Sequence, residues 1–235
     1  MGVKVKGLSK SYNKQKVVDS ISFEAGRGKI LGFLGPNGAG KSTTMKMLSC
    51  YLTPSSGTAE IAGFDTQTQS LQVKKVLGYL PENTPLYTDM YVREFLHFVA
   101  STYDLPKINE RVADVIEQVG LQEEMHKKIH MLSKGYKQRV GLAQAIIHDP
   151  KVLILDEPTS GLDPNQLADI RKLIKDLGRE RTVILSTHIM QEVEALCDQV
   201  IIINKGAVVA NDTLIDLKAS NQSSSLEDIF RKLTA

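Results

Sequence analysis

The sequence predicts an α/β protein with a mainly parallel central sheet and an α-helical segment inserted in the middle of the chain. Short apolar runs of strand length alternate with helical patterns on both sides of that segment. From about Thr88 to His148 the strand pattern stops, and apolar residues recur at helical spacing instead. With 235 residues, 42% of them hydrophobic, the chain is long enough to bury one sizeable core.

Four strands are expected before the inserted segment, because each is a short apolar run next to turn residues. They span Val17–Phe23, Lys29–Leu34, Gly57–Ala62 and Lys75–Leu80. The last of them ends at Pro81, which cannot continue a sheet ladder. A glycine-rich loop follows the second strand and leads into a helix with apolar residues Met45, Leu48 and Leu52.

The inserted segment contains a clear helical pattern that ends in a glycine. Its apolar residues Val112, Val115, Ile116 and Val119 share one helix face, and Gly120 stands where a helix cap is expected. Strands then return at Val152–Leu155, Thr182–Ser186 and Val200–Ile203. The renewed alternation of strands and helices indicates a mainly parallel sheet.

A helix is expected between the first two of these later strands. Asp163 is a good N-cap and Pro164 a good first residue. Its expected buried face consists of Leu167, Ile170, Leu173, Ile174 and Leu177. Near the end of the chain, the polar stretch Lys218–Ser225 reads as a linker before an amphipathic segment with Leu226, Ile229, Phe230 and Leu233.

The charge balance, the cysteines and the apolar runs of the chain argue against a nucleic-acid partner, a metal or disulfide site at the cysteines, and a membrane span. The chain has 29 basic and 27 acidic residues, so its net charge of +2 does not suggest a nucleic-acid partner. Cys50 and Cys197 lie in apolar patterns, which indicates reduced, buried thiols of a cytosolic protein rather than a metal site or a disulfide. No apolar run approaches the roughly 18 residues of a membrane span, so we expect any membrane role to require a partner.

The loop after the second strand, GPNGAGKS at residues 35–42, fits the phosphate-binding pattern G-x-x-x-x-G-K-[ST]. Glycines let consecutive backbone N–H groups turn toward a phosphate, and the start of the following helix adds partial positive charge. Lys41 is expected to neutralise the β- and γ-phosphates, and Ser42 to offer its hydroxyl to Mg²⁺. The predicted nucleotide-binding residues of this loop are Gly35, Asn37, Gly38, Ala39, Gly40, Lys41, Ser42 and Thr43.

Two carboxylates, Asp156 and Glu157, follow the apolar strand Val152–Leu155. Ligands gather at strand ends in open α/β sheets. We expect Asp156 to hold Mg²⁺, mostly through water, and Glu157 to polarise the attacking water or accept its proton. For either residue alone, the alternative to these roles is a carboxylate at a strand end that simply faces solvent. Loop and strand end together predict a Mg²⁺-dependent nucleoside triphosphate hydrolase.

The segment LSKGYKQR at residues 132–139 resembles the signature sequence of ATP-binding-cassette (ABC) ATPases. In that family a serine and a glycine at a helix start hold the γ-phosphate, and the resemblance gives this role to Ser133 and Gly135. The segment departs from the family signature at two positions. Lys134 replaces the first glycine of the signature, and Tyr136 replaces a glutamine. The resemblance covers the whole chain.

Further matches follow in the family's order. The resemblance implies that Tyr12 stacks on adenine, that Ser160–Asp163 is the D-loop and that His188 is the switch histidine. It thereby assigns catalytic roles to Glu157, His188 and Lys41. Taken singly, each match has a structural alternative: a core or edge tyrosine, a simple helix cap and a hydrogen-bonded histidine. The remaining histidines match no motif and are expected to be structural: His97, His126, His130 and His148.

Glu82 is another departure, because the family usually has a glutamine at this position. Two interpretations stay open. Its carboxylate reaches Mg²⁺ through water and adds negative charge beside the γ-phosphate, or it is a solvated glutamate without nucleotide contact. We include Glu82 with Ser42 and Asp156 in the predicted metal site.

The resemblance implies a P-loop NTPase fold with a mainly parallel core sheet, an antiparallel β subdomain near the N-terminus and an inserted α-helical subdomain. Residues 1–87 and 149–217 are expected to form the RecA-like core with the β subdomain. Residues 88–148 then form the helical subdomain with the signature motif, and residues 218–235 a C-terminal linker and helix.

The resemblance also implies that neither half of the ATP site is complete in one chain. We therefore expect a head-to-tail homodimer that closes on two ATP molecules, with ATP and Mg²⁺ as cofactors. The compact chain, its LSKGYKQR signature and its GYLPE and SLEDIF segments resemble ATPases of ABC-2 type exporters, including drug-resistance and gliding-motility ATPases.

Such ATPases lie in the cytoplasm on the inner face of the membrane and hold integral membrane transporter subunits. The expected contact is Asn83–Asp104, which is rich in aromatic residues and poor in charges. A soluble ABC ATPase of iron–sulfur cluster assembly, or another ABC ATPase without a transport role, is the alternative.

Overall fold

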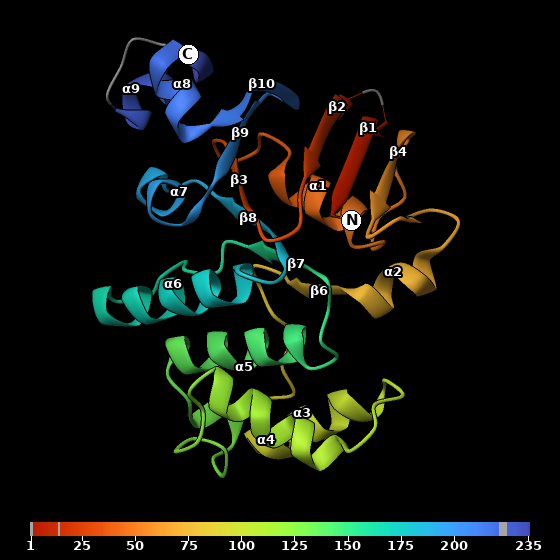
Figure 1. Cartoon of the computed structure of the whole chain (residues 1–235), viewed down its shortest axis with the longest axis vertical. Helices are drawn as coiled ribbons and strands as arrows, with labels where there is room; N and C mark the ends of the chain where they lie inside the picture. The colour runs from red at the N-terminus through yellow and green to blue at the C-terminus, as the bar shows by residue number, and fades with distance from the viewer. Residues whose placement is uncertain (1, 14, 221–224) are drawn as a thin grey trace.

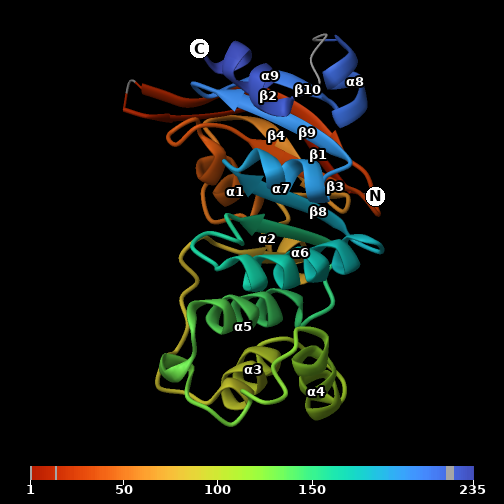
Figure 2. The same cartoon turned by 90° about the vertical axis from the view of Figure 1, so that its left-hand side faces the viewer.

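The computed structural model describes residues 2–13, 15–220 and 225–235 and has the predicted α/β architecture. A four-stranded sheet has the order β2-β1-β4-β5, and a six-stranded sheet has the order β10-β9-β3-β8-β7-β6. Both sheets lie above the helices of the inserted segment (Figure 1, Figure 2).

The six-stranded sheet is mainly parallel, as predicted. Its strands β9, β3, β8, β7 and β6 run in parallel, and only β10 pairs in the antiparallel direction, at the edge beside β9. The bounds are β3 (Ile30–Leu34), β6 (Leu77–Leu80), β7 (Val152–Asp156), β8 (Thr182–Thr187), β9 (Gln199–Asn204) and β10 (Ala207–Thr213).

Both faces of this sheet are covered, which explains why its strands read as continuous apolar runs. In β7, Leu153 and Leu155 pack into the core that includes helix α6 (Pro164–Gly178). The alternate residues Val152 and Ile154 pack into the core shared with helix α1 (Lys41–Leu48) and the four-stranded sheet. The sheet thus holds the end of β7 rigidly between two cores.

The four-stranded sheet consists of β1 (Val3–Tyr12), β2 (Gln15–Ala25), β4 (Ser56–Ile61) and β5 (Phe64–Asp65). All of its pairs are antiparallel, as the resemblance implied. The sequence analysis did not predict β1. Its buried Val3 and Val5 do alternate with lysines, but register shifts after Val5 break the alternation.

Three expected elements need correction. Lys75 and Val76 belong to helix α2 (Ser70–Val76), not to a strand, because Val73 and Val76 bury one helical face before β6 begins at Leu77. Helix α1 ends at Leu48, so Leu52 lies outside it. The turn closes when the amides of Tyr51 and Leu52 both donate to the Lys46 carbonyl, at 2.9 and 3.0 Å.

The third correction concerns the C-terminal linker. Residues 218–220 belong to helix α8 (Leu214–Ser220), which Leu217 anchors in a buried position, and residues 221–224 lie outside the described part of the chain. Helix α9 (Leu226–Thr234) confirms the amphipathic segment, with Leu226 and Ile229 buried against β9 and helix α7 (Met190–Leu196).

The inserted segment is helical, as predicted. It contains α3 (Val92–Ser101), α4 (Ile108–Gln118), the short 3₁₀ helix Ile129–Met131 and α5 (Lys134–Ile146). Gly120 has φ +69° just after α4, which is the left-handed conformation of a helix C-terminus. In α6 the Asp163 carboxylate caps the helix by accepting from the amides of Asn165 and Gln166, both at 3.0 Å. Within the described ranges, no helix has the length and hydrophobicity needed to cross a membrane.

Candidate nucleotide-binding site

The glycine-rich loop connects the end of β3 to the start of α1, at the carboxyl edge of the core sheet. Gly38 and Gly40 have φ of +80° and +104°, a region that other residues rarely adopt. A Cβ at Gly40 would lie 2.7 Å from the carbonyl oxygen of Val17 in β2. The close approach of β2 therefore requires glycine at this position.

Lys41 lies inside the curve of this loop and is only 6% exposed. Its Nζ donates hydrogen bonds to the carbonyl oxygens of Gly35 at 2.7 Å and Pro36 at 3.2 Å. Burial lowers the pKa of Lys41, while the nearby carboxylates of Glu157, Asp156 and Glu82 act in the opposite direction. The Glu157 carboxylate is 3.8 Å from Nζ, so the ammonium faces the end of β7.

Glu157 and His188 meet across the ends of β7 and β8. The Nδ1 atom of His188 lies 3.0 Å from both carboxylate oxygens of Glu157. Glu157 adopts φ +51°, and its amide donates to the carbonyl oxygen of Ser186 at 2.9 Å. This conformation is strained for a residue with a side chain and turns the carboxylate back toward the loop. Burial raises the pKa of Glu157, against the opposing effects of His188 and Lys41.

A cavity of about 380 Å³ joins most of the predicted site residues. Four predicted residues from outside the glycine-rich loop and the start of α1 add carboxylate, hydroxyl or imidazole groups to it. Its lining consists of Val17, Asn37, Gly38, Gly40, Lys41, Ser42, Thr43, Glu82, Glu157, Ser160 and His188. Val17 was not predicted, since it lies in β2 and no local pattern links it to a loop 20 residues later.

A neighbouring cavity of about 420 Å³ brings Ser42, Asp156 and Glu82 together. Asp156 is 2% exposed, and its Oδ1 atom has no hydrogen-bond partner among the described residues. A buried carboxylate oxygen without a partner is costly unless a ligand satisfies it. Hydroxyl and carboxylate oxygens suit Mg²⁺, which uses few protein ligands and keeps several waters. The described ranges contain no cluster of three or more His, Cys, Asp or Glu placed for a metal.

The three predicted nucleotide-binding residues from outside the glycine-rich loop and the start of α1 line neither cavity. Tyr12 stands at the end of β1 with 47% of its surface exposed, and Lys10 Nζ lies 5.5 Å from its ring centre. Ser133 caps α5 by accepting from the Tyr136 amide at 3.4 Å. Gly135 is buried against α6, where a Cβ would lie 2.6 Å from the side chain of Gln166. One chain therefore does not bring Ser133 and Gly135 to Lys41.

The sequence analysis also missed a buried hydroxyl and carboxylate group behind the site. The hydroxyls of Thr159 and Thr187 both donate to the carboxylate of Glu192, next to the loops that carry Glu157 and His188. No spacing rule points to them, because they come from three separate segments. The one available signal is position, since each threonine stands within two residues of a predicted catalytic side chain.

Comparison with known proteins assigns this arrangement to a family. A family model described as "ABC transporter" matches residues 18–160. The chain belongs to the ABC transporter family. Because ABC ATP-binding subunits hydrolyse ATP, its predicted function as an ATP-binding and ATP-hydrolysing subunit of such a transporter is confirmed.

Curated ABC relatives match along almost the whole chain. The bacitracin transport ATP-binding protein BcrA of Bacillus licheniformis is 40% identical over 94% of this chain and 72% of that protein. The ABC transporter ATP-binding protein NatA of Bacillus subtilis is 39% identical over 92% and 89%. The linearmycin resistance ATP-binding protein LnrL of Bacillus subtilis is 38% identical over 92% and 70%.

Solved ABC structures share the fold. A structure described as an ATP-binding subunit of an ABC transporter superposes with a TM-score of 0.91 at 30% identity, over 100% of both chains. The structure of cbiO1 from Clostridium perfringens gives 0.83 at 30% identity, over 98% of this chain and 93% of that one. None of these relatives and structures is an iron–sulfur assembly ATPase, so that alternative gains no support.

Proposed function

We propose that this chain is the ATPase subunit of an ABC-2 type exporter and that two copies close around two ATP molecules with Mg²⁺. The observation that supports this proposal is that one chain brings only some of the predicted ATP-binding residues together. Lys41, Glu157 and His188 share one cavity, whereas Ser133, the N-cap of α5, does not line it. The bacitracin transport relative BcrA and the linearmycin resistance relative LnrL support the exporter type.

In the proposed site the triphosphate lies in the glycine-rich loop. Gly35, Asn37, Gly38, Ala39 and Gly40 offer backbone N–H groups, and Lys41 exchanges its carbonyl partners for phosphate oxygens. Ser42 and Asp156 hold Mg²⁺, and Glu82 reaches it through water from an exposed position. When bound there, Mg²⁺ would supply positive charge against the negative charge of the phosphates. Thr43 follows at the helix start, and Tyr12 stacks on the adenine from the end of β1.

Glu157 is the proposed general base for the attacking water. Burial raises its pKa, which makes its carboxylate a better proton acceptor than that of an exposed glutamate. His188 holds the carboxylate through Nδ1, since a carboxylate accepts and the ring nitrogen donates. A hydrogen bond from Nε2 to the γ-phosphate would require this second ring nitrogen to carry a proton as well.

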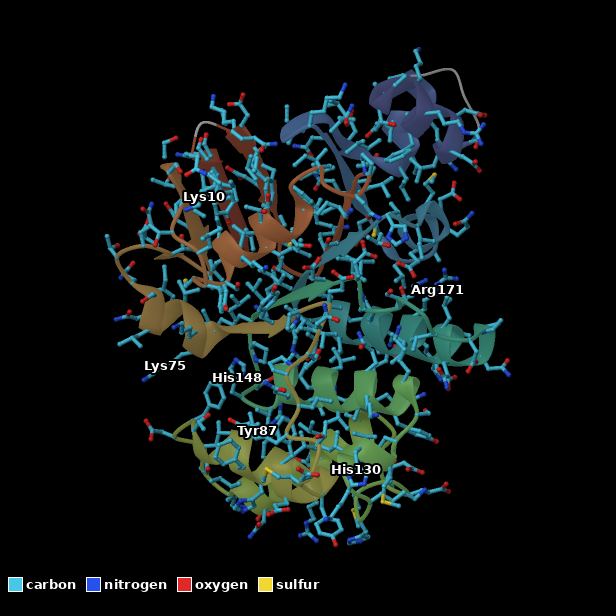
Figure 3. All side chains as sticks on the ribbon, turned by 180° about the vertical axis from the view of Figure 1, so that it is seen from behind. Lys10, Lys75, Tyr87, His130, His148 and Arg171 are labelled. Carbon is cyan, nitrogen blue, oxygen red and sulfur yellow. The ribbon has the colours of Figure 1, made fainter. Side chains whose placement is uncertain are left out.

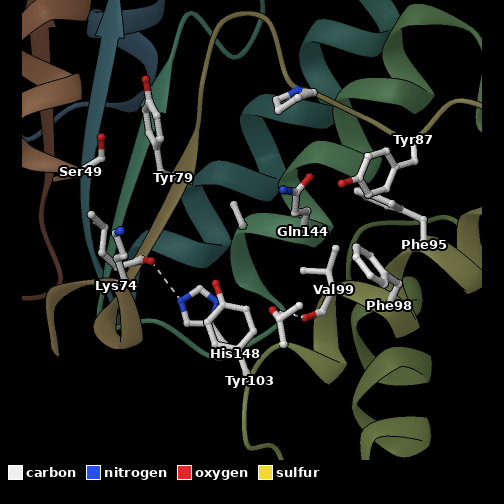
Figure 4. A pocket seen from close by; sticks show the side chains of 14 residues that line it. Ser49, Lys74, Tyr79, Tyr87, Phe95, Phe98, Val99, Tyr103, Gln144 and His148 are labelled. Atoms are coloured by element: carbon white, nitrogen blue, oxygen red, sulfur yellow. Dashed lines mark hydrogen bonds between the residues drawn. The ribbon is translucent and has the colours of Figure 1, made fainter. Parts of the chain in front are cut away.

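Docking of membrane subunits is proposed at a groove between the core and the inserted helices. The groove encloses about 460 Å³ (Figure 4). Tyr87 is 58% exposed and its ring lies 6.0 Å from Phe95 and 5.6 Å from Phe98. Figure 3 shows Tyr87 near the boundary between the core and the inserted helices, on the same side of the molecule as His148. These aromatics belong to the segment Asn83–Asp104, which would hold the subunit on the inner face of the cell membrane.

We propose the same subdomain limits as the sequence indicates: a core with β subdomain at 1–87 and 149–217, a helical subdomain at 88–148 and a C-terminal part at 218–235. The packing of α3 and α4 on each other and on α5 supports this division, while α5 also packs on β6 and so joins the helices to the core sheet.

Glu157→Gln tests the proposed chemistry. The variant keeps the shape of the side chain but removes the base, so we expect ATP turnover to fall about 10²- to 10⁴-fold. ATP binding should persist, and gel filtration with Mg²⁺ and ATP should show a stabilised dimer. Glu117→Gln, in an exposed position on α4, is the matched control and should behave as wild type. Wild-type turnover by Glu157→Gln would remove Glu157 from the reaction.

Co-purification in detergent tests the docking groove. Replacing Tyr87 and Phe98 together by serine should abolish recovery of a membrane protein with several spans, while ATP binding remains. Ile215→Ser, at an equally apolar and 80% exposed position on α8, should have no effect. Full recovery with the double variant would place the membrane contact elsewhere.

A further inference from the structure

Glu192 is a buried acidic residue in the first turn of α7, outside the cavities of the ATP site. It is 0% exposed. Its Oε1 accepts a hydrogen bond from the Thr159 hydroxyl, and its Oε2 accepts one from the Thr187 hydroxyl at 2.7 Å. A buried carboxyl group is costly unless its oxygens have such donors, so removing either hydroxyl leaves an unmet acceptor.

The two threonines belong to different loops of the site. Thr159 stands two residues after Glu157, in the connection from β7 to α6, and is 2% exposed. Thr187 is the last residue of β8 and directly precedes His188. Its hydroxyl also accepts from the Ile189 amide at 3.1 Å. Glu192 therefore contacts both loops through Thr159 and Thr187, and the hydrogen bond between Glu157 and His188 is a second link between them.

We propose that Glu192 is a positioning residue that fixes the loop of Glu157 relative to the loop of His188, through Thr159 and Thr187. The Glu157 main chain is strained, with φ +51°, and surrounding contacts must hold such a conformation. The carboxylate of Glu192 supplies two of those contacts. The effect on hydrolysis rests on the proposed function of Glu157 and His188, whereas the effect on loop geometry does not.

The test uses Thr159→Val and Thr187→Val, which keep side-chain size and remove one hydroxyl each. We expect kcat to fall about tenfold and KM for ATP to change less than about twofold, since small misplacement of a catalytic group lowers the rate more than binding. Thr159→Ser and Thr187→Ser restore the hydroxyl and should restore kcat. Thr182→Val is the matched control, because Thr182 is also buried and hydrogen-bonded, to the Gly26 carbonyl, at the opposite end of β8.

Nitrogen NMR of His188 in the nucleotide-free chain provides a readout that does not depend on hydrolysis. The Nδ1 signal should shift in both valine variants and stay unchanged in Thr182→Val. If the signal shifts but wild-type protein does not hydrolyse ATP, the positioning holds and the proposed function fails. If a valine variant is unfolded, Glu192→Gln of similar size replaces it and should show the same shift. An unchanged signal, an unchanged kcat, or equal losses with serine and valine overturn the positioning role.

Discussion

Nδ1 of His188 lies 3.0 Å from each carboxylate oxygen of Glu157, across the ends of two adjacent parallel strands. Because Lys41 approaches the same carboxylate from the glycine-rich loop, the three groups surround one cavity. The Glu157 side chain is buried, whereas the His188 side chain is 47% exposed. His188 is thus placed to contact a ligand while Glu157 is shielded from solvent.

His188→Ala should lower kcat for ATP by about 10² to 10⁴ and leave KM within about threefold, because positioning of the base and contact with the γ-phosphate are lost together. Steady-state kinetics measures both constants. His97→Ala, at an exposed position on α3, is the control. A variant as fast as wild type would show that the hydrogen bond to Glu157 has no part in hydrolysis.

Lys41→Ala should weaken ATP binding at least about tenfold, which corresponds to about 1.4 kcal/mol. The reason is the loss of the buried ammonium that faces the phosphate-binding loop. Titration calorimetry gives the affinity directly. Lys75→Ala, on α2 at the edge of the molecule in Figure 3, should bind as wild type. Equal affinities for the two variants would exclude Lys41 from the site.

His148 should make stability depend on pH. Its ring stacks on Tyr103 at 4.2 Å, and Nε2 donates to the Leu77 carbonyl at 3.0 Å, which leaves the buried Nδ1 without a partner in the described structure. Burial lowers its pKa, so the unfolded chain binds this proton more readily than the folded one. The contribution of the neutral His148 ring to the free energy of unfolding is complete above the unfolded pKa of about 6.5. It is lost as the pH falls toward the pKa of His148 in the folded chain.

Urea unfolding between pH 7.5 and 5.5 checks this prediction. The free energy of unfolding should fall with decreasing pH, with a contribution from His148 of up to about 1.4 kcal/mol per pH unit. His148→Phe keeps a ring against Tyr103 and should flatten the dependence by that amount. Identical slopes for both proteins would mean that His148 titrates alike in the folded and unfolded chains.

The sequence predicts the parts of the site that are contiguous. Gly35–Ser42 needs only a strand before it and a helix after it, and the run of buried residues in β7 leads directly to Asp156 and Glu157. The contact of Val17 with Gly40 and the bonds of Glu192 to Thr159 and Thr187 join distant segments, so only the folded chain shows them. The sequence predicts a strand that begins at Lys75, whereas Lys75 ends up in α2, because a short apolar run fits both a strand and a helix end.

Complementation between defective chains tests whether the site is shared. Lys41→Ala lacks the phosphate-binding lysine, and Ser133→Arg blocks the start of α5. In an equal mixture, half of the dimers are mixed and each has one intact site, so activity should return to about one quarter of wild type. Wild-type protein mixed with excess Lys41→Ala/Ser133→Arg is the control, because its mixed dimers contain no intact site. Activity no greater than that of the separate variants would contradict sharing.

The central claim is that one ATP molecule contacts two copies of the chain. A crystal structure of Glu157→Gln with ATP and Mg²⁺ measures this directly. We predict that Ser133 Oγ of one protomer lies about 3 Å from a γ-phosphate oxygen whose triphosphate is held by Lys41 of the partner. A structure in which Ser133 stays more than about 10 Å from every triphosphate, far beyond hydrogen-bond reach, would contradict it.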